Sequence, residues 1–317
     1  MPVSTLEKFR GGMLGGALGD AVGALAASHG DYESLIDWIG EGDILRYTDD
    51  TAMLIGIAEA LTKSGGGINE EEIGKIFQRN YVREPWRNYS QSLTAIFATV
   101  KRHEVPFSEA AGRLHEGKGS PGNGAAMRNT PVGLLFRNSA RLREFAEKTA
   151  RITHTHEVGV DGAAIMAWAT AQLANIDPKA KFPFASFCTG IVSFAQTKVM
   201  RLRLVQMIEL IASNAPAEKA AAELDLSQTV KLELSESVAE SLPYAIYSFL
   251  ANRKSFKECV YCAVLQGVGD RDTMGAMAGA LSGAYLGGKA IPKDWVSRVE
   301  NREMLEGFAK QLNNIDV

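Results

Sequence analysis

The order of apolar and polar residues along the chain predicts helices almost throughout. Met53, Ile57 and Leu61 recur at a spacing of four, so they would line one buried face of a helix. Two later segments repeat this pattern, one through Met200, Leu204, Met207, Ile208 and Ile211 and the other through Met274, Met277, Leu281 and Tyr285. We interpret all three stripes as core-facing.

Capping motifs and polar loops indicate where these helices begin and end. Two S-x-x-E capping boxes, Ser4 with Glu7 and Ser255 with Glu258, predict helix starts. Loops rich in glycine and polar residues are predicted at about 43–51, 117–129 and 266–273. No alternating run bounded by turn residues indicates a strand. The pattern therefore predicts an all-α fold, a single compact domain over residues 1–317.

Residues 11–27 form an apolar, glycine-rich stretch in which Asp20 is the single charged residue. Such a stretch is similar to a signal peptide or a short membrane span. However, it contains six glycines, and each weakens an isolated helix by ~1 kcal/mol relative to alanine. We therefore predict a buried helix whose small face lets other helices approach closely, and we expect a cytoplasmic protein with no membrane partner.

Composition excludes some classes of function. The net charge of −3 argues against a broad basic surface for nucleic acids or membranes, although a small anionic ligand stays compatible with it. The chain has three cysteines, and this low, odd number does not make a disulfide framework. Cys259 and Cys262 form a C-x-x-C pair, which is either a redox or metal motif or two small apolar residues on a helix. We favour the second interpretation because no second pair and no βαβ pattern accompany it.

Two acidic motifs precede predicted helices. Thr48-Asp49-Asp50-Thr51 comes before the Met53 helix, and Asp270-Arg271-Asp272-Thr273 comes before the Met274 helix. One such residue at each start would serve as an N-cap. Adjacent carboxylates repel unless a cation or a proton compensates, and hard oxygen ligands suit Mg²⁺, Mn²⁺ or Ca²⁺ rather than zinc. The pattern is compatible with caps and with a metal site, and spacing alone does not show that the motifs meet.

A glycine-rich loop and a histidine pair are further candidates. Residues 119–128, GSPGNGAAMR, would let backbone N–H groups approach a phosphate, with a helix beginning near Ala125. An ordinary turn at Asn123-Gly124 is the competing and more frequent interpretation. His154 and His156 are two residues apart, so they do not form the zinc pair of an H-E-x-x-H motif. From the chemistry of histidine alone, His154 is compatible with a structural role and with a catalytic role.

Taken in order, these segments resemble the ADP-ribosylglycohydrolase family. The matching segments are GGMLGGALGDAVGA (11–24), YTDDTAM (47–53), GNGAAMR (122–128), THTHEVGVDGA (153–163) and GDRDTMGAMAGALSGAYLG (269–287). Each is modest alone, but all five in the family's order are specific. The resemblance implies an orthogonal all-α fold and removal of ADP-ribose from a modified acceptor, with arginine on an ADP-ribosylated protein as the first candidate.

The resemblance also implies a site. Two Mg²⁺ ions, with Mn²⁺ as an alternative, would be held by Thr48, Asp49, Asp50, Asp270, Asp272 and Thr273. The ADP-ribose part of the substrate would contact Ser120, Gly122, Asn123, Gly124 and His154. Asp49, or Asp50 beside it, would be the catalytic residue that acts as general base or steers the leaving group.

Two positions depart from the family pattern. Arg271 stands where a threonine is common, and we expect its side chain to point away from the metals. Ala27 stands where many members carry a glutamate near the metals; Glu33 or Glu41 would be the substitutes. This departure puts serine-linked substrates in doubt. It also keeps two alternatives open: a hydrolase of another ADP-ribose conjugate, nucleic-acid-linked ones included, and a protein that binds ADP-ribose without cleaving it.

Overall fold

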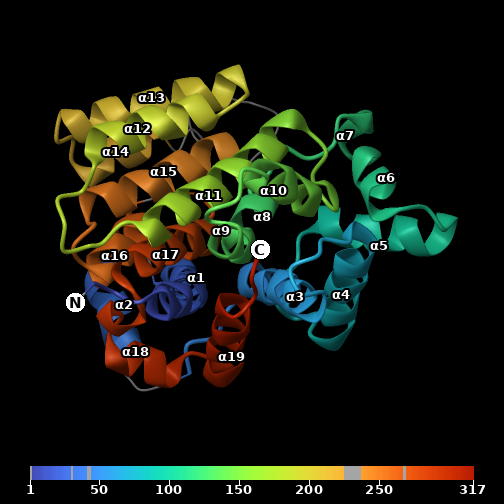
Figure 1. The fold of residues 1–317 in the computed structure, drawn as a ribbon, viewed down its shortest axis with the longest axis horizontal. Helices are drawn as coiled ribbons and strands as arrows, with labels where there is room; N and C mark the ends of the chain where they lie inside the picture. The colour runs from blue at the N-terminus through green and yellow to red at the C-terminus, as the bar shows by residue number, and fades with distance from the viewer. Residues whose placement is uncertain (1, 30, 41–43, 225–236, 267–268) are drawn as a thin grey trace.

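A computed structural model of the chain describes residues 2–29, 31–40, 44–224, 237–266 and 269–317. These residues form helices joined by short connections, and apart from two isolated β-bridges they contain no strand (Figure 1). The predicted all-α fold is therefore confirmed.

The helices follow one another along the described residues. The first half contains α1 (Thr5–Ser28), α2 (Tyr32–Gly40), α3 (Asp49–Lys63), α4 (Glu70–Arg83), α5 (Gln91–His103), α6 (Phe107–Gly112), α7 (Leu114–Gly117), α8 (Gly124–Met127), α9 (Thr130–Leu135) and α10 (Leu142–Arg151). The second half contains α11 (Glu157–Asn175), α12 (Phe184–Phe194), α13 (Lys198–Ala212), α14 (Ala217–Leu224), α15 (Val238–Ala251), α16 (Phe256–Leu265), α17 (Arg271–Leu286), the 3₁₀ turn η2 (Gly288–Ala290), α18 (Lys293–Arg298) and α19 (Arg302–Asn313).

Helices α1 and α17 lie together inside the molecule, with α12 to α14 along one edge and α4 to α7 at another (Figure 1). The two inner helices run antiparallel, and glycines face each other at every fourth position, pairing Gly11 with Gly283, Gly15 with Gly279 and Gly19 with Gly275. A Cβ atom on any of these glycines would collide with the facing backbone. The glycines of α1 therefore allow a backbone-to-backbone approach that no other residue permits.

The predicted character of residues 11–27 is confirmed, since most of α1 is buried in the core. Among the described residues, no helix combines the length and the apolar character needed to cross a membrane. The Ser4 hydroxyl accepts the Glu7 N–H at 3.3 Å and begins α1 as predicted.

The predicted stripes pack into one hydrophobic cluster that extends from Phe9 near the start of the chain to Leu312 near its end. The stripes of α3 and α17 are buried, as are Met200, Leu204 and Met207 of α13, while Ile208 and Ile211 are half-buried. The second capping box is also confirmed, because the Ser255 hydroxyl accepts the Glu258 N–H at 3.3 Å at the start of α16.

Cys259 and Cys262 both lie on α16 and carry free thiols. Cys259 is fully buried, and its thiol lies 3.5 Å from the Ala278 carbonyl oxygen that accepts from it. Burial raises the pKa of both thiols, which makes the thiolate scarce. These are properties of packed helix residues, as we predicted, and differ from those of a redox pair.

Candidate active site

A cavity of about 720 Å³ brings the predicted segments together. Of the predicted site residues, Asp49, Asp50, Ser120, Gly122, Asn123, Gly124, His154, Asp270, Asp272 and Thr273 line it. Thr48 is buried directly behind this wall, with its hydroxyl 3.1 Å from Asp50 Oδ2. The distant stretches of chain that carry the motifs therefore converge on one space.

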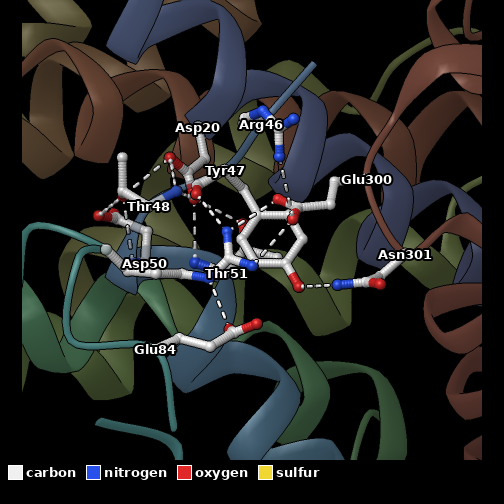
Figure 2. Close-up of polar contacts among 10 residues, drawn as sticks. Asp20, Arg46, Tyr47, Thr48, Asp50, Thr51, Glu84, Glu300 and Asn301 are labelled. Carbon is white, nitrogen blue, oxygen red and sulfur yellow. Dashed lines mark hydrogen bonds and ion pairs between the residues drawn. The ribbon is translucent and has the colours of Figure 1, made fainter. Parts of the chain in front are cut away.

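Asp20 of α1 is the residue around which the first acidic motif folds (Figure 2). Its carboxylate accepts the Thr48 N–H at 3.0 Å and the Thr51 N–H at 3.0 Å. The Thr51 hydroxyl donates to it at 2.6 Å, and the Thr48 hydroxyl lies 2.9 Å away. An acid on one helix thus satisfies the free N–H groups at the start of another, α3.

Sequence reasoning missed Asp20. We noted it only as the single charge of an apolar stretch, and that isolation was the available signal. A charge in a buried helix of small residues needs partners, and here the partners come from α3. The capping interpretation of Thr48 is also correct, because its hydroxyl caps α3 while it lies between Asp20 and Asp50.

Three carboxylates from different helices form the centre of the site. Asp20, Asp50 and Asp272 each present an oxygen atom, and these atoms lie within 4.8 Å of one another. The close crossing of α1 and α17 produces this proximity, because Gly23 packs directly against the Cα atom of Asp272. Asp49 and Asp270 lie beside the three and interact with each other electrostatically.

This crowding changes the acidity of the carboxyl groups. Burial, and then the charge of Asp20, raises the pKa of Asp49 and of Asp50 well above the usual range. Burial and Asp270 raise the pKa of Asp272 to about 9. Burial raises the pKa of Asp20 to about 6, although the hydrogen bonds from Thr51 and Thr48 oppose the rise. Burial and mutual repulsion therefore disfavour the ionised forms of Asp49, Asp50 and Asp272, whereas Asp20 is mostly ionised at neutral pH.

The residues present fit a divalent cation. Asp50 Oδ1 is buried and has no hydrogen-bond partner among the described residues, so a strong acceptor atom is left unsatisfied. Carboxylate and hydroxyl oxygens are the ligands that Mg²⁺, Mn²⁺ and Ca²⁺ prefer. A cation among them would supply the charge that the crowded acids lack.

The second acidic motif contacts the glycine-rich loop. Asp270 is the N-cap residue of α17, and its Oδ2 accepts a 2.9 Å hydrogen bond from the Asn123 amide. Asp272 follows in the first turn, where its Oδ1 accepts the Thr273 N–H at 3.1 Å. Asn123 therefore connects the acidic cluster to the wall predicted to hold ADP-ribose.

Residues 119–124 form a tight loop along the cavity. Gly119 has a φ of 74° and packs against Thr155, where a Cβ atom would collide. The Gly122 N–H donates to the Ser120 hydroxyl at 3.1 Å. Gly124 begins the short helix α8, so the predicted helix near Ala125 is present and Asn123-Gly124 is not an isolated turn.

His154 also lines the cavity and precedes α11, while His156 is the N-cap residue of that helix. The Thr153 hydroxyl lies 2.7 Å from Nδ1 of His154. Burial, followed by the charge of Arg128, lowers the pKa of His154 to about 3. The imidazole is therefore neutral at physiological pH.

One wall of the cavity was not predicted. It consists of Asn88, Tyr89, Ser90, Gln91, Ser92, Leu93, Ile96 and His115. These residues follow α4 or precede α8 and belong to no motif. The run of polar residues at 88–92 was the only feature of the sequence that could have indicated a binding surface here. The Tyr89 hydroxyl is buried without a hydrogen-bond partner in the part of the chain that the structure describes.

Arg87 joins this wall to the acidic motif. Its carbonyl oxygen accepts the Asp49 N–H at 2.7 Å, and its guanidinium donates to the Tyr47 carbonyl oxygen at 2.8 Å. It also forms a bidentate pair with Glu300 at 2.8 Å and 3.0 Å. Near the same segment, Asn301 donates to the Tyr47 hydroxyl at 2.7 Å (Figure 2). The C-terminal part of the chain thus holds residues 47–49 in place.

The departures from the family pattern have clear positions. Ala27 is exposed on the last turn of α1. Glu33 is exposed on α2 and does not line the cavity, and Glu41 lies outside the described residues. Arg271 donates to the Ala26 carbonyl oxygen at 2.5 Å, at the C-terminal end of α1. Among the described residues, no glutamate lines the cavity in place of the missing one.

Comparisons with known proteins agree with this arrangement. The sequence profile of the ADP-ribosylglycohydrolase family matches residues 1–316. ADP-ribosylhydrolase ARH3 of Xenopus tropicalis is 29% identical over 99% of this chain and 97% of its own length. The human ARH3 is 28% identical over 98% of this chain and 94% of its own. An uncharacterized protein of Archaeoglobus fulgidus is 30% identical over 96% of both.

A solved structure shares the fold. It is described as an ADP-ribosylglycohydrolase-related protein complex and superposes with a TM-score of 0.73 at 22% identity, covering 99% of both chains. The full-length family match, the relatives and the convergence of the motifs lead to one conclusion. The chain belongs to the ADP-ribosylglycohydrolase family and is a glycohydrolase enzyme.

Proposed function

We propose that this enzyme is a magnesium-dependent hydrolase that releases ADP-ribose from ADP-ribosylated arginine on protein. The observation that carries the proposal is the cluster of Asp20, Asp50 and Asp272, two of which, Asp50 and Asp272, line a cavity of about 720 Å³. The other walls offer the glycine-rich loop and a neutral histidine. This combination suits a ligand with a diphosphate and ribose hydroxyls.

The metal ligands in this proposal are Thr48, Asp49, Asp50, Asp270, Asp272 and Thr273, around two Mg²⁺ ions, with Mn²⁺ as an alternative. A bound cation supplies positive charge that orients the ribose hydroxyls and offsets the crowded carboxylates. Ser120, Gly122, Asn123, Gly124 and His154 hold the ADP-ribose part. Asp20 is added to the predicted set as the residue that positions Thr48 and Thr51.

The reaction replaces a glycosidic bond with a bond to water. The bond from the anomeric carbon to the leaving nitrogen breaks, and its electron pair stays on that nitrogen. A water oxygen attacks the carbon, and Asp49 or Asp50 accepts the proton that the water loses. The developing oxocarbenium charge lies near the acidic end of the cavity, where negative groups stabilise it.

Arginine is favoured as the acceptor because of its leaving group. A guanidinium already carries its proton, so it departs as a neutral guanidine and needs no general acid. A serine oxygen needs a proton from an acid as it leaves. Ala27 stands where many family members have a glutamate, and among the described residues no other glutamate lines the cavity.

The test is the release of ADP-ribose from matched arginine-, serine- and nucleic-acid-linked conjugates, each with Mg²⁺ and with EDTA. We expect the enzyme to release ADP-ribose from the arginine conjugate with Mg²⁺. With EDTA the rate of this release should be about a hundredfold lower. Asp50→Asn should lower the rate about as much. Equal rates in Mg²⁺ and EDTA would refute the metal dependence, and preference for another linkage would refute the acceptor.

A second candidate is a protein that binds ADP-ribose without cleaving it, which the alanine at position 27 favours. Calorimetry with ADP-ribose and product analysis of the conjugates separate the two. Binding with no product from any conjugate over hours would establish this alternative.

A further inference from the structure

Arg128 is a buried cation next to the cavity whose role the proposed function does not explain. Only 1% of its surface is exposed, and its guanidinium lies 4.9 Å from the centre of the Phe77 ring. Its Nη2 donates to the Thr149 carbonyl oxygen at 3.0 Å and to the Thr153 hydroxyl at 2.7 Å. No carboxylate of the described residues lies within ion-pair distance of it.

The contact with Thr153 fixes the direction of the next hydrogen bond. A guanidinium only donates, so the Thr153 oxygen is the acceptor toward Arg128. Thr153 is itself 2% exposed, and its single hydroxyl proton needs an acceptor. In the described part of the chain, the remaining partner is Nδ1 of His154, at 2.7 Å. The hydroxyl proton therefore points at Nδ1, and Nδ1 carries no proton.

The opposite direction would be costly. If Nδ1–H donated to Thr153, the hydroxyl oxygen would accept two bonds and its proton would be buried without an acceptor. The cost of such an unpaired donor favours the first direction by roughly five- to 150-fold. The pKa of His154, lowered to about 3 by burial and by Arg128, keeps the ring neutral as well. A neutral ring without a proton on Nδ1 carries it on Nε2.

Nε2 is on the edge of the ring that faces the glycine-rich loop. A Cβ atom built on Gly124 would lie 3.3 Å from Nε2 and 3.1 Å from Cε1. His154 lines the cavity, and Nε2 has no hydrogen-bond partner in the described residues. Its N–H is thus free to meet a ligand beside residues 119–124.

We propose that Arg128 is a positioning residue that acts through Thr153 to fix His154 as a neutral Nε2–H donor, which selects an acceptor oxygen on the bound ligand. The inference rests on the proposed function for the identity of that ligand. The oxygen belongs to the diphosphate or ribose part of ADP-ribose, which is rich in acceptors. A ligand presenting only an N–H or O–H group at this point would meet a donor and would be rejected.

The state of the ring is measured in ligand-free protein by long-range ¹H–¹⁵N NMR, with His154 assigned by its loss in His154→Gln. We expect an unprotonated Nδ1 and a protonated Nε2. His156 provides an internal control, because its Nδ1 accepts the Val158 N–H at 3.2 Å and should stay so in every variant. A proton on Nδ1 of His154, or an imidazolium at neutral pH, would overturn the proposal.

The path through Thr153 is tested with a matched pair of variants. Thr153→Val removes the hydroxyl at similar volume, whereas Thr153→Ser keeps it. We expect the valine variant to populate both neutral tautomers and, because only the Nε2–H form donates to the ligand, to bind ADP-ribose about twofold more weakly in Mg²⁺ when the two are equally populated. The serine variant should keep the Nε2–H form and the wild-type affinity. A valine variant with unchanged tautomer and affinity would refute the role of Thr153.

The contribution of Arg128 has its own test. Arg128→Met removes the donor but keeps an unbranched side chain. It also frees the Thr149 carbonyl oxygen that shares Nη2 of Arg128 with Thr153, so the Thr153 hydroxyl can donate to that carbonyl and accept from Nδ1–H. We expect a mixture of tautomers in this variant, and a pure Nε2–H form would refute the role of Arg128. Failure of the proposed function can be distinguished from failure of this inference. Wild-type protein that neither binds nor releases ADP-ribose would refute the proposed function, whereas the spectra of ligand-free protein decide the tautomer of His154 in either case.

Discussion

The Thr51 hydroxyl donates a 2.6 Å hydrogen bond to the carboxylate of Asp20 and thereby joins α3 to α1 at the acidic cluster. Both residues are almost completely buried. The bond therefore operates in a low dielectric, where a charged acceptor strengthens it. The contrast with Thr170, whose buried hydroxyl has no partner among the described residues, yields the first prediction.

Thr51→Val should destabilise the protein by about 1.5–3 kcal/mol, because it removes a donor to a charged group. Thr170→Val should be neutral or stabilising by about 1 kcal/mol, because it removes a polar group that is buried without a partner. Urea denaturation of the metal-free variants measures both changes. Equal effects of the two substitutions would contradict the assigned hydrogen bond.

The glycine contacts between α1 and α17 predict a large difference between two chemically identical substitutions. Gly279→Ala places a methyl group into the Gly15 carbonyl and should cost more than about 4 kcal/mol or prevent folding. Gly307→Ala, in α19 with nothing within 4 Å, should stabilise by about 0.5–1 kcal/mol. Thermal unfolding of the purified variants provides the comparison. A well-folded Gly279→Ala protein would show that the two helices are farther apart.

Addition of Mg²⁺ to metal-free protein should raise its stability by mass action, by about 2.7 kcal/mol at a hundred times the dissociation constant. Asp50→Asn should lose most of this gain. Without Mg²⁺, however, the variant should be at least as stable as wild type, because it removes an acid whose pKa is raised by burial and by its acidic neighbours and which therefore lowers stability at neutral pH. Unfolding curves with Mg²⁺ and EDTA measure both effects. An unchanged response to Mg²⁺ in the variant would exclude Asp50 as a ligand.

His154 should make the protein less stable in acid. Its pKa is about 3 when folded and near 6.5 when unfolded, so between these values the unfolded chain binds more protons. Stability therefore rises from pH 3 to 6.5, and at pH 5 the contribution of His154 is about 2 kcal/mol below its value at neutral pH. His154→Gln should remove that part of the decline between pH 7 and pH 5. Parallel profiles for wild type and variant would mean that His154 is protonated in the folded state.

The sequence predicted the helices well because their stripes, caps and loops are local signals. The Met53 stripe, the Ser4 cap and the buried 11–27 segment all depend on neighbours within a few residues. The four aspartates of the two acidic motifs were brought together only by the family resemblance, since spacing says nothing about contacts between distant segments. The structure supplies the physical reason, which is the antiparallel register of α1 and α17.

Two parts of the site were beyond sequence reasoning. Asp20 was recognised as unusual, but its partners Thr48 and Thr51 follow only from the packing of α1 on α3. The wall around Tyr89 has no motif, because it is a connection placed by the helices on either side of it. The direction of the Thr153–His154 hydrogen bond likewise depends on Arg128, which is contributed by another segment.

The packing of α1 against α17 also determines at which stage of protein synthesis the site can form. Asp20 and Asp50 leave the ribosome more than 200 residues before Asp272, so a growing chain carries the first two acids of the cluster long before the third. An incomplete chain that ends before α17 consequently has neither the cation site nor the glycine contacts that bury α1. Catalytic competence therefore has to wait until α17 has been synthesised and has packed against α1.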